Sequence, residues 1–103
     1  MIQEIDNAKE FDSALKNDIT VVDFHADWCM PCVMMAPVME EIAKKMKKIN
    51  FIKVNVDDHQ EISKKYDIMS IPTIVILKKG KEAGRIIGAM SAETLEEKFK
   101  KFI

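Results

Sequence analysis

The only two cysteines of the chain, Cys29 and Cys32, are two residues apart and directly follow its only tryptophan, Trp28. Two thiols this close could form a reversible disulfide, supply half of a metal site, or be inert and buried. In a reducing compartment a close pair is more often catalytic or metal-binding than structural. Structural zinc takes four ligands, and the chain adds only His25 and His59. A redox pair is the favoured interpretation, and a metal site bridged between two copies is the alternative.

The residues on either side of the pair indicate how it is positioned. Residues 19–26 form a short run rich in Val and Phe, which predicts a buried strand. From residue 31 to about 48, apolar residues recur every three or four positions, which predicts a helix. At such a junction the free N–H groups and the helix dipole favour a thiolate, and they lower a cysteine pKa from about 8.5. We expect Cys29 to be the more exposed, attacking sulfur and Cys32 to be the buried, resolving one.

The remaining pattern predicts an α/β fold in a single domain over residues 1–103. A short first strand is followed by helices, strands and a hairpin. Helix-capping residues, turn residues and the regular spacing of apolar residues mark where these elements begin and end. These elements are a helix over 8–16 with an Asn7-x-x-Glu10 capping box, a strand over 51–56, a helix capped by Asp58-x-x-Glu61, strands over 73–78 and 82–87 around a Lys79-Gly80 turn, and a helix capped by Ser91. Strand–helix–strand units give parallel pairs, and the hairpin adds an antiparallel pair. The expected architecture is a central mixed sheet of about five strands flanked by four helices.

Composition excludes several classes of function. The formal net charge is −1, with 16 basic and 17 acidic residues, so there is no electrostatic basis for binding nucleic acid or an anionic membrane. The N-terminal sequence lacks the basic and apolar regions of a signal peptide, and no apolar run reaches the roughly 18 residues of a membrane span. We therefore expect a cytoplasmic protein, and a monomer, because no oligomerisation element is apparent.

The chain resembles the thioredoxin family over essentially its whole length. The resemblance is carried by the stretch from Val22 to Cys32, which ends in Trp-Cys-Met-Pro-Cys, and by Ala36-Pro37, Lys53-Val54-Asn55-Val56-Asp57, Ile71-Pro72-Thr73, Gly80 and Gly88. It implies a thioredoxin fold and a protein-disulfide reductase that carries electrons and maintains cell redox homeostasis. Cys29 would attack a substrate disulfide and Cys32 would resolve the mixed disulfide.

The resemblance also implies re-reduction by an NADPH-dependent flavoprotein reductase and no bound cofactor beyond the reversible Cys29–Cys32 disulfide. A non-catalytic interaction module using the same surface is the other alternative.

Two charged residues are expected to support the cysteines. Asp23 interrupts an apolar strand, and burial should raise its pKa, which suits proton exchange with Cys32. Lys53 lies in the next strand, and the resemblance implies that it neighbours this aspartate. His25 is expected to be a satisfied strand residue rather than a base or a ligand.

The resemblance also implies a substrate surface around the cysteines. It implies a cis peptide bond between Ile71 and Pro72, although most X–Pro bonds are trans. The backbone of Ile71 would pair with an extended substrate segment. The other expected contacts form an apolar rim: Trp28, Met30, Pro31, Met69, Gly88 and Ala89.

Two residues depart from the commonest motif of the family. Met30 stands where glycine is usual, and Val33 stands where a basic residue commonly follows the second cysteine. Losing a nearby cation weakens the stabilisation of a thiolate, and a larger apolar side chain changes access to Cys29. Both changes should alter the reduction potential and recognition by a reductase.

Overall fold

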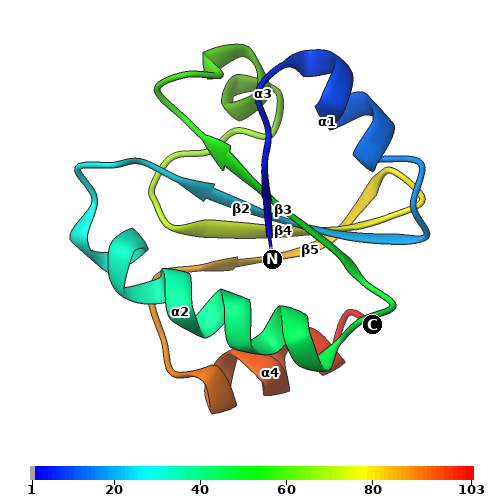
Figure 1. Ribbon diagram of the computed structural model, residues 1–103, viewed down its shortest axis with the longest axis vertical. Coiled ribbons are helices and arrows are strands. Elements are labelled where there is room, and N and C mark those ends of the chain that lie inside the picture. Colours follow the sequence, from blue (N-terminus) through cyan, green and yellow to red (C-terminus); the bar gives the residue numbers. More distant parts are fainter. Residues whose placement is uncertain (1) are drawn as a thin grey trace.

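The computed structural model describes residues 2–103 as a mixed sheet with helices on both faces (Figure 1). In chain order the elements are β1 (Gln3–Glu4), α1 (Ala8–Ala14), β2 (Ile19–His25), α2 (Met30–Lys45), β3 (Asn50–Asn55), α3 (Gln60–Lys65), β4 (Thr73–Lys78), β5 (Lys81–Ile87) and α4 (Ala92–Lys100). The sheet order is β1-β3-β2-β4-β5. β3 pairs in parallel with β1 and β2, whereas β4 is antiparallel to β2 and β5. The predicted fold class is confirmed.

Successive side chains of the central strands point to opposite faces of the sheet, which divides the core into two layers. Helices α2 and α4 cover one face of the sheet, and α1 and α3 lie over the other (Figure 1). The layer under α2 and α4 contains Val21, Met35, Met39, Ile42, Phe51, Ile74, Ile76, Leu95 and Phe99. The layer under α1 and α3 contains Ile5, Phe11, Val22, Phe24, Ile52, Val54, Ile62, Val75 and Leu77. Because Val21 faces α2, Asp23 two residues later faces the same side.

The helix caps partly follow the sequence prediction. Asn7 caps α1, since its side chain accepts the backbone N–H of Glu10 at 2.9 Å. The prediction that Asp58 caps α3 is wrong, because His59 occupies the N-cap position without a side-chain cap bond. The preceding turn is closed instead by Asn55, whose Oδ1 accepts the backbone N–H groups of Asp57 and Asp58.

Element ends differ from the predicted ends by a few residues. α2 stops at Lys45 instead of about 48, because Met46 leaves helical backbone with φ −105° and ψ 66°. The Lys79-Gly80 turn is confirmed, and both residues have positive φ, 51° and 80°. Within residues 2–103, no helix is both long enough and apolar enough to cross a membrane.

Candidate functional site

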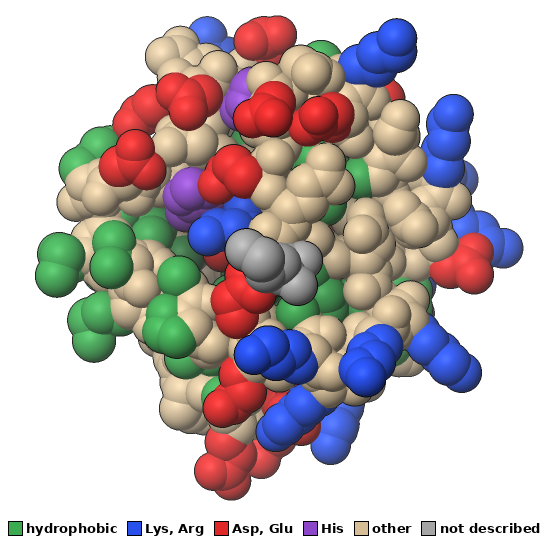
Figure 2. All heavy atoms as spheres, in the orientation of Figure 1, with side chains coloured by type: hydrophobic (Ala, Val, Ile, Leu, Met, Phe, Trp, Pro, Cys, Tyr) green, Lys and Arg blue, Asp and Glu red, His purple; other side chains and the backbone are tan. Residues whose placement is uncertain are grey.

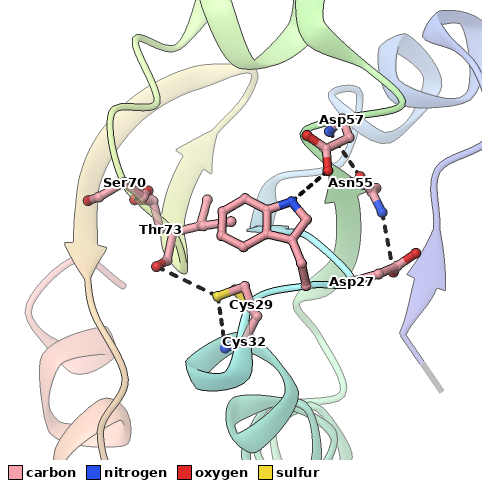
Figure 3. The surroundings of a disulfide bond; sticks show 9 residues. Asp27, Cys29, Cys32, Asn55, Asp57, Ser70 and Thr73 are labelled. Carbon is pink, nitrogen blue, oxygen red and sulfur yellow. Dashed lines mark hydrogen bonds between the residues drawn. A yellow bond between two sulfur atoms is a disulfide. The ribbon is translucent and has the colours of Figure 1, made fainter.

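The two cysteines lie at the carboxyl end of β2, where α2 begins (Figure 3). They are joined by a disulfide, with Cα atoms 5.2 Å apart. Cys29 is the N-cap of α2, and its Sγ accepts the backbone N–H of Cys32 at 3.2 Å. Pro31 lies in the first helical turn, where no N–H is required. A thiolate at Cys29 would receive the same N–H and the positive end of the helix dipole.

The expected difference in exposure between the two cysteines is wrong for this disulfide form. Cys29 is 4% exposed and Cys32 is 6% exposed, so both are buried. They pack with Ala26 and with the half-buried side chains of Val56 and Ile71. Ile71 approaches Cys29 most closely through its backbone, since Cys29 Sγ lies 3.9 Å from its carbonyl oxygen.

Both histidines have partners other than the cysteines. His25 Nε2 lies 2.9 Å from Glu4 Oε1, and His59 Nε2 lies 2.9 Å from the carbonyl oxygen of Ile5. Among residues 2–103, no three or more His, Cys, Asp or Glu side chains are grouped so as to hold a metal ion. His25 is thus a satisfied strand residue, as expected.

A cavity of about 300 Å³ connects Asp23 with the second cysteine. Asp23 is only 3% exposed, and its β3 neighbour in the sheet register is Lys53. The structure therefore brings Asp23 and Cys32, the two residues expected to exchange a proton, together with Lys53, which was expected to neighbour Asp23, since all three line this cavity. The remaining lining residues are Glu4, His25, Ala26, Asp27, Val33 and Ala36.

Burial raises the pKa of Asp23 from 3.8 to about 6. The charges of His25 and Lys53 oppose this rise, and Glu4 adds to it. A carboxyl group with a pKa near the ambient pH can both accept and return a proton, which is the property that general acid–base catalysis requires.

The Ile71–Pro72 segment lies beside the disulfide, and its peptide bond is cis, as expected. Pro72 is buried, and its carbonyl oxygen accepts the backbone N–H of Gly88 at 2.9 Å. Thr73 Oγ1 donates to the carbonyl oxygen of Ser70 at 2.6 Å, which closes the loop before β4. Ile71 precedes β4, so it is outside the strand ladder and next to Cys29.

An apolar groove of about 310 Å³ runs along this segment. Trp28, Met69 and Ile71 line it, and Val56, Ile68 and Ser70 complete it. Trp28 is 70% exposed and Met69 is 92% exposed, which is unusual for side chains of this size. The other expected rim residues also reach the surface: Met30, Pro31 and Ala89 are exposed, and Gly88 is half-buried with φ 99°. Figure 2 shows hydrophobic side chains gathered over the N-terminal end of α2.

The predicted site omitted a hydrogen bond that holds Trp28. Its indole Nε1–H donates to Asp57 Oδ2 at 2.8 Å, and Asn55 lies between Asp57 and Asp27 (Figure 3). An available signal was the indole N–H itself, which is a donor that a carboxylate such as that of Asp57 can accept.

A disulfide that caps a helix at the carboxyl end of a central strand, beside a cis-proline, defines a protein of the CxxC dithiol class. The family model described as Thioredoxin matches residues 3–101. Thioredoxin of Mycoplasmoides gallisepticum is 42% identical over 100 residues, which cover 96% of this chain and 100% of that protein. Thioredoxin-1 of Saccharomyces cerevisiae is 38% identical over 89% of this chain and 90% of its own. The solved structure of Plasmodium falciparum thioredoxin matches with a TM-score of 0.92 and 36% identity, covering 99% of this chain and 100% of that one. The chain belongs to the thioredoxin family.

Proposed function

We propose that the protein reduces disulfides of other proteins by dithiol–disulfide exchange. The observation that carries this proposal is the position of Cys29 Sγ at the N-terminus of α2, within bonding distance of Cys32 and bound to its N–H. In the reduced protein this N–H and the helix dipole stabilise a Cys29 thiolate. The thiolate attacks one sulfur of a substrate disulfide, and the other substrate sulfur leaves as a thiolate.

Cys32 then resolves the mixed disulfide. Its thiol proton passes to the Asp23 carboxylate through the shared cavity, and its sulfur attacks Cys29 Sγ. The Cys29–Cys32 bond forms as the bond between Cys29 and the substrate breaks, and the second substrate sulfur leaves with the electron pair. Lys53 supplies a positive charge that supports the ionised form of Asp23.

Substrates dock on the groove beside the disulfide. The backbone of Ile71 is outside the β4 ladder and accepts an extended segment of the substrate in the manner of an added strand. Apolar contact comes from the rim formed by Trp28, Met30, Pro31, Met69, Gly88 and Ala89, and the buried Pro72 lies beneath it beside the disulfide. Methionine is flexible and polarizable, so this rim suits substrates of varied sequence.

The physiological cycle requires a source of electrons. The family implies an NADPH-dependent flavoprotein reductase that returns the disulfide to the dithiol. We propose that residues 1–103 act as one monomeric domain in the cytoplasm. The protein would need no bound cofactor, because the reversible disulfide itself carries the electrons.

The proposed activity is tested by the reduction of insulin by dithiothreitol, followed as turbidity. Wild type is expected to accelerate precipitation, and Cys29→Ser is expected to abolish the acceleration. No acceleration by wild type would contradict the proposal. In that case, metal bound to a purified dimer would favour a bridged site, and partner binding by the doubly substituted Cys29→Ser, Cys32→Ser protein would favour an interaction module.

A further inference from the structure

A second ionisable pair lies in the cavity of Asp23. His25 follows Asp23 by two residues in β2, so both side chains point to the same face of the sheet. His25 Nε2 is 2.9 Å and 3.0 Å from the two carboxylate oxygens of Glu4. Glu4 belongs to β1, which is separated from β2 by β3 in the sheet order. The pair therefore runs diagonally across β3, because Glu4 shares a register position with Lys53 and Asp23, whereas His25 is paired with Asn55, two residues further along β3.

The charged groups around Asp23 come from every element that borders the cavity. β1 contributes Glu4 and β3 contributes Lys53, while the loop before α2 contributes Asp27 and α2 contributes the Cys32 thiol. On the remaining side, the β4 neighbour of Asp23 is Ile74, which has no charge. His25 and Lys53 are thus the cationic side chains among the residues that line this cavity.

The two cationic side chains differ in how strongly they influence Asp23. Of the charges that oppose the effect of burial on the Asp23 pKa, His25 has the larger influence and Lys53 the smaller. The larger of the two charges that support ionised Asp23 therefore comes from its own strand, β2.

We infer that His25, anchored by Glu4, is a positioning residue for the cysteine chemistry: its positive charge keeps Asp23 ionised and ready to accept the Cys32 proton. This inference rests on the proposed function. With the charge of His25 in the same cavity, the ionised Asp23 carboxylate takes the Cys32 proton as the Cys29–Cys32 bond forms and the substrate thiolate leaves. When His25 is replaced by a neutral residue, more Asp23 is protonated near pH 6, and fewer molecules can resolve the mixed disulfide.

The test separates the Cys29 and Cys32 steps with a symmetrical aryl disulfide whose thiolate is coloured. Reduced protein releases one aryl thiolate when Cys29 attacks and a second when Cys32 resolves, and Cys32→Ser should release only the first. In His25→Gln we expect the second phase to be about two- to fivefold slower near pH 6, since a nearby charge shifts a pKa by roughly half a unit to one unit. The first phase should be unchanged, and the rates should converge near about pH 8, where Asp23 is ionised in both proteins.

Two further variants and a titration of Asp23 serve as controls for the His25→Gln result. His25→Lys keeps a positive charge and should restore the second phase near pH 6. His59→Gln makes the same substitution at the other histidine, which contacts Ile5 outside the cavity, and should behave as wild type. The carboxyl carbon of Asp23, followed by NMR, should titrate at higher pH in His25→Gln and at lower pH in His25→Lys than in wild type.

The outcomes separate this inference from the proposed function. An unchanged Asp23 titration in both His25 variants would overturn the inference, as would equal slowing of both phases at every pH, which indicates a purely structural role. A wild-type protein that shows no Cys32-dependent second release would instead contradict the proposed function.

Discussion

Replacing Asp23 by asparagine should stabilise the protein at neutral pH while slowing its reaction. Burial raises the pKa of Asp23 from 3.8 to about 6, so the native state binds this proton more tightly than the unfolded state. The free energy of unfolding therefore falls as pH rises from 3.8 to about 6 and is lowered by a constant amount above that range. A difference of about two pKa units corresponds to about 3 kcal/mol. Asparagine is neutral at every pH and avoids this cost.

The assay is urea unfolding of the oxidised proteins at several pH values. Asp23→Asn should be more stable than wild type by up to about 3 kcal/mol at pH 7, and the difference should vanish below about pH 4. Asp58 is exposed, so Asp58→Asn is the control and should change stability by no more than about 0.5 kcal/mol. A stabilisation that does not vary with pH, or none at all, would refute the assignment of Asp23 as a buried carboxyl with a raised pKa.

Three further substitutions test other parts of the structure. Val33→Lys places a cation at the start of α2 and should increase the alkylation rate of Cys29 in the reduced protein about two- to fivefold at pH 6, measured with iodoacetamide; an unchanged rate would show that this position does not influence the thiolate. Trp28→Ala removes the exposed ring over the groove and should raise KM for insulin roughly fivefold, as expected for loss of about 1 kcal/mol of binding, with kcat unaffected. Gly84→Val should destabilise the fold by about 1–3 kcal/mol because a Cβ there overlaps the ring of Phe102, and the added substitution Phe102→Ala should remove most of that clash; denaturant midpoints of the single and double variants decide this.

Local sequence patterns predicted the elements that hold the cysteines. The apolar run of β2 and the three- and four-residue period of α2 place Cys29 at the junction without any knowledge of tertiary contacts. Asp23 was identified because a carboxyl within an apolar strand must be either buried or bonded. The cis bond before Pro72 was expected only from the family resemblance, since local sequence favours trans.

Contacts between distant segments could not be predicted in this way. Glu4 reaches His25 only because β1 is added to the sheet beyond β3. A strand of two residues is too short to show an alternation of apolar and polar residues, so its place in the sheet could not be inferred from the sequence. The burial of Cys29 likewise depends on Ile71, which is 42 residues away along the chain. Sequence identified which groups could react, and the order of strands determined which charges surround them.

The most direct test of the mechanism is to trap the mixed disulfide. Reduced Cys32→Ser should accumulate a covalent complex with an oxidised protein substrate through Cys29, identified by mass spectrometry of the linked peptides. Reduced Cys29→Ser should give little or none under the same conditions. If Cys29→Ser instead formed the complex through Cys32, or if neither variant formed one, the assignment of Cys29 as nucleophile and Cys32 as resolving thiol would be contradicted.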